Sequence, residues 1–354
     1  MLLNYLIFES MKRREDEGVE FRVSNLGGLH EALSRLRKSK GRAPMDRCLW
    51  WHADCENPIG SHSLSECWLR AVSDEGKSIV LRLNASKAGK EPVKIVSELD
   101  GVSRISVFKG FCSTHDNKIF NPIDRLDFEA TKENCCLATY RSVCHAVASK
   151  YAVASTYLQT PNVLKSESPS ELDKVAIKTM RECIDLMALK QQYEAWMNRE
   201  IATEPIEHKF AFIEPRLPFC GSVTFLPCVT PTGRMLDVDQ TWMSIVVLPW
   251  KSGSLVIFAI DRKSPKNGSL VVKMFNSIPQ VWKADILFKY MIECGENIAI
   301  APKWWFELRE GVRNDILNRS FRNVRTSSTA PSNLFLQRGV PLTPCRHTIQ
   351  GSAA

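Results

Sequence analysis

Four residues in the first part of the chain are of the types that bind soft metal ions. Cys48 and Cys55 are separated by six residues in RCLWWHADCENP, and Cys112 and His115 by two residues in GFCSTHDNKIF. Thiolate and imidazole are the ligands that Zn²⁺ prefers, and four of them complete a tetrahedral structural site. A C-x-x-H pair fits one turn at the start of a helix, where both side chains can reach one ion. The sequence therefore predicts a zinc site made of Cys48, Cys55, Cys112 and His115.

The first half of this ligand set has alternatives. The spacing between Cys48 and Cys55 is wider than the spacing usual in zinc sites, and His52, His62 and Cys67 are near enough in sequence to serve as ligands. Cysteines can also be small core residues without any metal. The sequence leaves these interpretations open.

Two further residues beside the predicted ligands could take part in hydrolysis. His62 lies in GSHSLS, and Asp116 directly follows His115. A neutral imidazole near its ordinary pKa can take a proton from water, and a carboxylate can hold Mg²⁺, which prefers oxygen ligands. The alternatives are that His62 is a zinc ligand or a capping residue, and that Asp116 is an acid favoured at a helix N-terminus.

Residues 45–122 resemble the HNH, or ββα-metal, nuclease motif in its treble-clef zinc form. The resemblance rests on the knuckle-like first ligand pair, the histidine of SHSL and the distant FCSTHDNKIF. It implies that His62 is the general base, that Asp116 stands where the family has its catalytic metal ligand, and that zinc holds both in place. The long gap from His62 to Cys112 implies an insertion between the two strands of the motif.

Charge is consistent with a nucleic-acid partner but does not require one. Lys+Arg 47 against Asp+Glu 39 give a net charge of +8 over 354 residues, a mild excess. The strongly basic stretch LSRLRKSKGRAPMDR, residues 33–47, lies next to the predicted zinc site. Its side chains would contact backbone phosphates, or they would form only a solvated helix face. The candidate phosphate contacts are Arg35, Arg37, Lys38, Lys40 and Arg42.

Hydrophobic patterns predict an α+β protein. Residues 129–158 and 170–202 have apolar side chains at helical spacing, which predicts two long helices paired as a hairpin. Short runs such as WMSIVVLPW and LVIFAIDRK, separated by Pro and Gly turns, predict a mainly antiparallel sheet closed by helices. The predicted parts are a basic helical lead-in at 1–47, a zinc-binding module at 48–122, the helical hairpin at 123–205, a β-rich domain at 206–325 and a flexible tail at 326–354.

Other classes of function lack support in the sequence. The phosphate-binding loop, the dinucleotide fingerprint, the nucleophile elbow and the zincin motif are all missing. Cys144 and His145 are adjacent, so on a helix they point in different directions and predict one core and one surface residue. Most of the 12 cysteines, such as Cys183 and Cys220, are expected to be reduced core residues. The tryptophan pair of KWWFE, residues 303–307, is expected in the core in preference to stacking on bases.

The leading functional hypothesis is a metal-dependent endonuclease that cleaves DNA or RNA, with structural Zn²⁺ and catalytic Mg²⁺. A similarity of layout to bacterial proteins with a zinc-bearing N-terminal part implies a role in defence against phage. The alternative is a non-catalytic, zinc-stapled interaction or sensing scaffold that binds a protein partner, or a second copy of the chain, through its C-terminal domain. No stretch reaches the roughly 18–20 apolar residues that a membrane span needs, and a cytoplasmic location is expected.

Overall fold

The computed structural model describes residues 48–50, 55, 57–84, 94–159, 171–227, 236, 241–295, 297–320 and 347–352. The basic stretch 33–47 therefore lies outside the described residues, and so does the possible ligand His52. The five candidate phosphate contacts that belong to this stretch are Arg35, Arg37, Lys38, Lys40 and Arg42.

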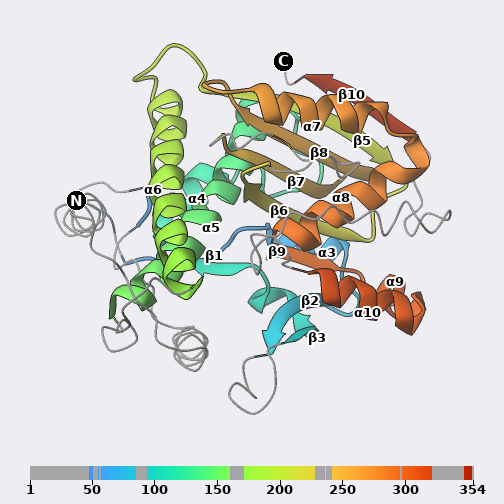
Figure 1. Ribbon diagram of the computed structural model, residues 1–354. Coiled ribbons are helices and arrows are strands. Elements are labelled where there is room, and N and C mark those ends of the chain that lie inside the picture. Colours follow the sequence, from blue (N-terminus) through green and yellow to red (C-terminus); the bar gives the residue numbers. More distant parts are fainter. Residues whose placement is uncertain are drawn as a thin grey trace.

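An eight-stranded sheet lies at the centre of the described structure (Figure 1). Every pairing between its neighbouring strands is antiparallel, which confirms the predicted sheet type. In spatial order the strands are β10 (His347–Ser352), β5 (Ile206–Glu214), β8 (Gly253–Asp261), β7 (Met243–Trp250), β6 (Phe219–Phe225), β9 (Asn297–Ile300), β2 (Lys77–Asn84) and β3 (Lys94–Gly101).

Both faces of the sheet are buried. In β7, Ile245 and Val247 belong to one apolar core, whereas Val246 and Leu248 belong to the other. Successive side chains of a strand point to opposite faces, so a strand covered on both sides reads as a continuous apolar run, as SIVVL does. The helices on the first face are α7 (Lys266–Ser277), α8 (Gln280–Cys294), α9 (Pro302–Glu307) and α10 (Glu310–Arg319).

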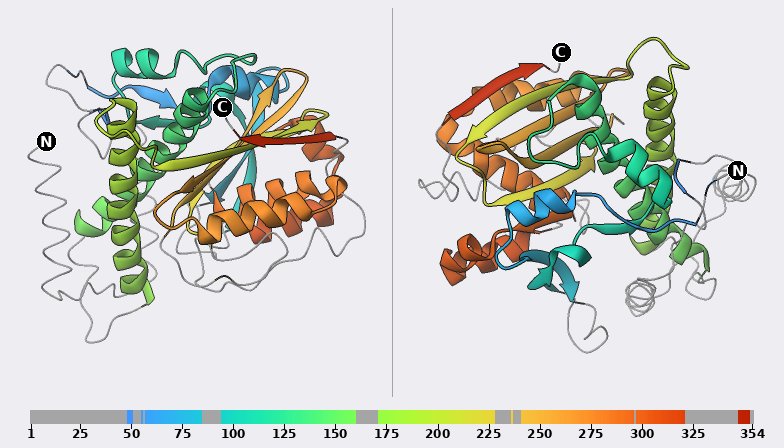
Figure 2. Two further views of the ribbon diagram at one scale, coloured as in Figure 1. Left: turned by 90° about the horizontal axis from the view of Figure 1, so that it is seen from above. Right: turned by 180° about the vertical axis from the view of Figure 1, so that it is seen from behind.

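The opposite face carries two long helices (Figure 2). They are α5 (Lys132–Gln159) and α6 (Glu171–Met197), and they pack against each other as the predicted hairpin. Tyr140 of α5 and Tyr193 of α6 lie in this contact, with ring centroids 5.9 Å apart. α5 also packs on β6 and β7, so it lies between the sheet and the elements that carry the predicted zinc ligands.

Those elements include a small two-stranded antiparallel sheet of β1 (Gly60–His62) and β4 (Val107–Lys109). The chain then enters α4 (Ser113–Phe120), which begins directly after Cys112. The predicted insertion lies between β1 and β4. It contains α3 (Glu66–Ala71), the 3₁₀ turn η1 (Val102–Arg104) and the strands β2 and β3.

The insertion connects the predicted zinc module to the rest of the molecule. β2 pairs with β9 at Ile79 and Ile300, so strands assigned by sequence to the 48–122 module belong to the large sheet. The apolar residues around the predicted ligands share one core with α5, α6 and the near face of the sheet. The sequence-derived boundaries therefore describe the order of the chain but do not separate independent cores.

One expectation for the C-terminal part was wrong. Residues 347–352, assigned to a flexible tail, form β10 along the outer edge of β5, from His347 opposite Glu214 to Ser352 opposite Lys209. An edge strand presents unpaired backbone groups that a further segment can pair with, and periodicity alone did not show that β5 would be such an edge. The rest of the predicted tail lies outside the described residues.

Several buried side chains agree with the sequence interpretation. Cys183 and Cys220 are buried, and no disulfide forms among the described cysteines. Cys144 is buried as expected, but His145, expected at the surface, is half-buried and its ring packs edge-on against Phe108, with centroids 5.4 Å apart. Of the tryptophan pair in KWWFE, Trp305 is buried in the core and Trp304 is half-buried against the same core. No helix within the described ranges is long and apolar enough to cross a membrane.

Because both faces of the sheet are buried, shortening one apolar side chain on a central strand should destabilise the protein. Ile257→Ala, at a fully buried position of β8, should lower the free energy of unfolding by about 2–5 kcal/mol because it leaves a cavity. Leu99→Ala, on β3 where the side chain is half-exposed, should change it by less than about 0.5 kcal/mol. Urea denaturation followed by circular dichroism measures both, and equal effects would contradict the arrangement of the core.

Candidate metal centre and the polar cluster beside it

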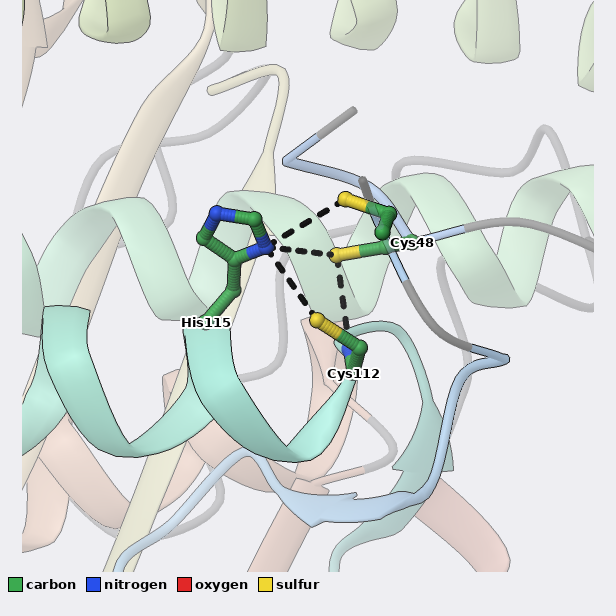
Figure 3. Close-up of side chains that lie close together, drawn as sticks. Cys48, Cys112 and His115 are labelled. Carbon is green, nitrogen blue, oxygen red and sulfur yellow. Dashed lines mark hydrogen bonds between the residues drawn. The ribbon is translucent and has the colours of Figure 1, made fainter. Parts of the chain in front are cut away.

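The four predicted zinc ligands come together. One ligand atom from each of Cys48, Cys55, Cys112 and His115 lies within 4.8 Å of every other. The Nδ1 atom of His115 is 3.7 Å from Cys48 Sγ, 3.3 Å from Cys55 Sγ and 3.2 Å from Cys112 Sγ. In Figure 3 the sulfurs of Cys48 and Cys112 lie on the Nδ1 side of the His115 ring, between the first turn of α4 and the opposing loop.

Backbone hydrogen bonds hold the two halves of the set together. Leu49 N–H donates to the Gly110 carbonyl at 2.6 Å, and Ile59 N–H donates to the Phe111 carbonyl at 2.8 Å. Cys112 directly precedes α4, and its backbone carbonyl accepts the Asp116 N–H at 2.9 Å. The segment that carries Cys48 is thereby fixed beside the turn from β4 into α4.

The geometry fits a tetrahedral ion. With zinc–sulfur bonds of about 2.3 Å and a zinc–nitrogen bond of about 2.0 Å, neighbouring sulfur and nitrogen ligands lie about 3.5 Å apart, close to the observed separations. The Cys112 N–H also donates to Cys48 Sγ at 3.3 Å, a bond that suits a thiolate. Burial raises the pKa of the Cys48 thiol to about 12, and a bound cation would offset that cost. The cluster could therefore hold a metal ion such as zinc.

His62 is not part of this cluster. It lies at the end of β1, half-buried, with Nδ1 3.0 Å from the Ile105 carbonyl oxygen. A carbonyl oxygen can only accept, so Nδ1 carries the hydrogen and the neutral ring has its lone pair on Nε2. His62 thus has the tautomer that a base acting through Nε2 requires.

Charges from three helices act on the His62 imidazole. Burial lowers its pKa below the usual 6.5, and Arg141 of α5 adds to that effect. The Ile105 carbonyl and the carboxylates of Glu66, on α3, and Asp116, on α4, act in the opposite direction. Because burial is the largest effect, the imidazole is neutral at neutral pH.

Ser106, whose backbone is strained, directly follows Ile105, whose carbonyl accepts the hydrogen bond from His62. Ser106 has a φ of 62°, a left-handed conformation that is uncommon for a residue other than glycine. Its hydroxyl accepts the Leu64 N–H at 2.7 Å and lies 3.0 Å from the Ser63 hydroxyl, while its carbonyl accepts the Ser63 N–H at 2.8 Å. These bonds hold the turn in which the Ile105 carbonyl meets His62.

Asp116 lies in the first turn of α4 and is mostly buried. Its Oδ1 atom is 3.5 Å from Arg141 Nη2, and the Asp116 side chain is 17% exposed. Within the described part of the chain, this oxygen is buried and has no hydrogen-bond partner. A buried carboxylate oxygen without a hydrogen bond is costly, and the positive charge of Arg141 offsets part of that cost.

His62, Asp116, Arg141 and Asp124 form a polar cluster near the metal ligands, and sequence reasoning missed the last two of these residues. The Arg141 side chain is only 2% exposed, and its Nη1 atom is 2.7 Å from Asp124 Oδ1. The guanidinium also lies over the Phe120 ring, 4.3 Å from its centroid. The Ser65 hydroxyl donates to the same Asp124 oxygen at 2.6 Å. The available signal was a lone arginine in the apolar helix sequence CCLATYRSVCHAV, since a buried arginine needs partners.

The alternative ligands are not part of the metal cluster. Cys67 donates its thiol hydrogen to the Ser65 hydroxyl at 3.5 Å and is not among the four clustered residues. His62 has the partner described above, and His52 lies outside the described residues. Among the ligands weighed from sequence that the structure describes, the set of Cys48, Cys55, Cys112 and His115 is the one brought together.

Comparisons with known proteins add no relative. No family model, no curated protein and no solved structure matches this chain.

Metal content should depend on Cys112 and not on Cys67. Cys112→Ser should remove about one bound metal ion per chain and lower the melting temperature, because a structural metal stabilises the folded state. Cys67→Ser serves as the matched control and should keep the metal, since its thiol donates to Ser65 and is not among the four clustered ligands. Elemental analysis of the purified proteins measures the ion and identifies it. Equal metal content in the two variants would contradict the assignment of the ligands.

Proposed function

We propose that this protein is a metal-dependent endonuclease of the HNH type, which hydrolyses phosphodiester bonds in DNA or RNA. The observation that carries the proposal is that His62 has a fixed tautomer and is not one of the clustered metal ligands. The charge of Asp116 acts on this imidazole, and its Nδ1 donates to the Ile105 carbonyl. A histidine held in this way is a suitable general base.

The arrangement of β1, β4 and α4 supports the proposal. A two-stranded antiparallel sheet leads into a helix whose start supplies two metal-type ligands, Cys112 directly before the first turn and His115 within it, followed by Asp116. This is the order of parts expected for a treble-clef, ββα-metal module. Three cysteines and a histidine favour zinc over harder cations, and the ion would act structurally because all four ligand positions come from the protein.

The proposed chemistry assigns separate tasks to two side chains. Nε2 of His62 takes a proton from a water molecule, whose oxygen forms the new bond to phosphorus while the bond to the leaving oxygen breaks. The leaving oxygen takes a proton from solvent. Asp116 is the proposed carboxylate ligand of Mg²⁺, and that ion would neutralise the negative charge that develops on the phosphate.

The proposed substrate contacts rest on sequence. The stretch 33–47 precedes Cys48 directly, so its basic side chains can lie near the site at which the backbone would be cut. Contacts to phosphates carry no base specificity, so they suit either DNA or RNA. Defence against phage is the proposed biological setting, and the resemblance in layout to zinc-bearing bacterial proteins supports it.

A non-catalytic scaffold is the second candidate, and one observation favours it. Asp116 is paired with the buried Arg141, which gives that carboxylate a structural role that needs no magnesium. Under this alternative the metal cluster would staple the fold, and the C-terminal helices, where Val281 and Phe306 are exposed, would bind a protein partner or a second copy of the chain.

Replacing the proposed base separates the two candidates. His62→Ala should reduce Mg²⁺-dependent cleavage of plasmid DNA or of RNA by roughly 10²–10⁴-fold, the usual contribution of a general base. The metal content and the melting temperature should stay close to those of the parent protein, because His62 is outside the cluster. Loss of the structural metal in this variant, or a parent protein that does not cleave, would favour the scaffold. Unchanged cleavage in His62→Ala would contradict His62 as the base.

The rate should persist into mildly acidic solution. Burial lowers the pKa of His62, and only the neutral imidazole can accept the proton from water. The acidic limb of the pH profile of kcat/KM should therefore have its midpoint below 6.5, the usual value for histidine. Steady-state cleavage at saturating Mg²⁺ over a series of buffers measures the midpoint. A midpoint clearly above that value, or an unchanged limb in His62→Ala, would contradict the assignment.

A further inference from the structure

Arg141 joins the parts of the proposed site from outside the HNH-like region. It belongs to α5, whereas Asp116 lies on α4 and Asp124 in the segment between these helices. Its side chain is 2% exposed, with Nη1 2.7 Å from Asp124 Oδ1 and Nη2 3.5 Å from Asp116 Oδ1. One guanidinium thus bridges two carboxylates from separate segments.

The bridge extends toward the proposed base. Asp124 accepts the Ser65 hydroxyl hydrogen at 2.6 Å, and Ser65 directly precedes α3, three residues after His62. The hydrogen-bonded chain from Ser65 through Asp124 to Arg141 therefore connects the end of the His62 strand to the carboxylate of Asp116. The Arg141 guanidinium also lies over the ring of Phe120, on α4.

The burial of these groups makes the geometry sensitive to a change at Arg141. Asp116 Oδ1 and Arg141 Nε are buried without a hydrogen-bond partner in the part of the chain that the structure describes. Without the guanidinium, the Asp116 carboxylate would have no positive partner at that position and would turn toward solvent, because an uncompensated buried charge is unfavourable. Lysine cannot replace the arginine, since an ammonium is a point charge without the planar fork that reaches two carboxylates.

We propose that Arg141 is a positioning residue that sets the Asp116 carboxylate for a divalent cation, so that the working site consists of the HNH-like region together with α5. This inference rests on the proposed function, because it takes Asp116 to be the ligand of the catalytic cation. Arg141 itself is too deeply buried to touch the nucleic acid, so it acts through Asp116.

The test uses Arg141→Lys in the full-length, metal-loaded protein. This variant keeps the positive charge but lacks the planar guanidinium. It therefore removes the bridge between the two carboxylates without changing the net charge of the site. The matched control is Arg82→Lys. Arg82 also bridges two carboxylates, Glu98 at 3.1 Å and Asp100 at 2.6 Å, but it lies on β2 away from the proposed site.

The first readout is independent of cleavage. Binding of Mn²⁺, as a paramagnetic substitute for Mg²⁺, is titrated by electron paramagnetic resonance, with Asp116→Asn as the reference for a lost ligand. Arg141→Lys should weaken Mn²⁺ binding roughly 10–100-fold, the usual cost of removing a residue that orients a metal ligand. Arg82→Lys should bind Mn²⁺ as the parent protein does. Equal affinity in the parent and Arg141→Lys would overturn the inference.

A second readout distinguishes positioning from a merely structural role. At saturating Mn²⁺, the kcat of Arg141→Lys should fall by a similar factor while the KM for nucleic acid stays unchanged. A lower melting temperature with unchanged Mn²⁺ affinity and kcat would show that Arg141 only stabilises the fold. If Arg141→Lys does not fold, Asp124→Asn removes the second anchor of the bridge and should weaken Mn²⁺ binding in the same direction; unchanged binding there would overturn the inference.

The failure of this inference differs from the failure of the proposed function. A parent protein that binds no Mn²⁺ and cuts neither DNA nor RNA would contradict the proposed function, and the inference with it. A parent protein that binds Mn²⁺ and cleaves, with Arg141→Lys identical to it, would contradict the role of Arg141 alone.

Discussion

The convergence of three thiols and one imidazole on a single point joins the first described residues to the start of α4. Cys48 and His115 are 67 positions apart in the chain, and between them lie a small two-stranded sheet, a short helix and two strands of the large sheet. A bound ion would close this long loop, and closing a long loop removes many conformations from the unfolded chain. The four ligands thereby fix the start of α4 against the segment that carries Cys48.

The placement of the polar cluster follows from that constraint. α4 begins at the metal ligands, so Asp116, one residue after His115, must lie in its first turn. β4 precedes α4 and pairs with β1, which places His62 opposite Val107 and within reach of the Ile105 carbonyl. From the other side, α5 contributes Arg141, which lies over Phe120 of α4. The site is thus assembled between the metal cluster and the core that α5 shares with the sheet.

The metal-binding region is not an independent unit. The strands inserted between β1 and β4 extend the central sheet, and the apolar residues around Cys112 belong to the same core as α5 and α6. A change in the packing of the helical hairpin would therefore reach Arg141 directly. This coupling gives a physical route by which the larger part of the chain could influence a site near the N-terminal part.

Sequence reasoning succeeded where the relevant signal is local. The spacing of Cys112 and His115 on a helix start, the long helices and the apolar strands could all be recognised from residue types and periodicity, and the structure has them. Arg141 and Asp124 were missed because they approach the site only through the tertiary packing of α5, which no spacing reveals. The edge strand β10 was missed for a similar reason, since a strand that pairs only at an edge needs no long apolar run. The insertion was expected from the gap between His62 and Cys112, but its pairing with β9 depends on contacts distant in sequence.

The coordination shell of the bound metal tests the central claim most directly. X-ray absorption spectroscopy at the zinc edge of the purified protein should give three sulfur ligands at about 2.3 Å and one nitrogen ligand at about 2.0 Å. That result would keep His62 free of the metal and available as a base. A shell with two nitrogen ligands would place a second histidine on the ion, and a shell dominated by oxygen, or a protein without zinc, would contradict the Cys/His cluster as the organising centre of the site.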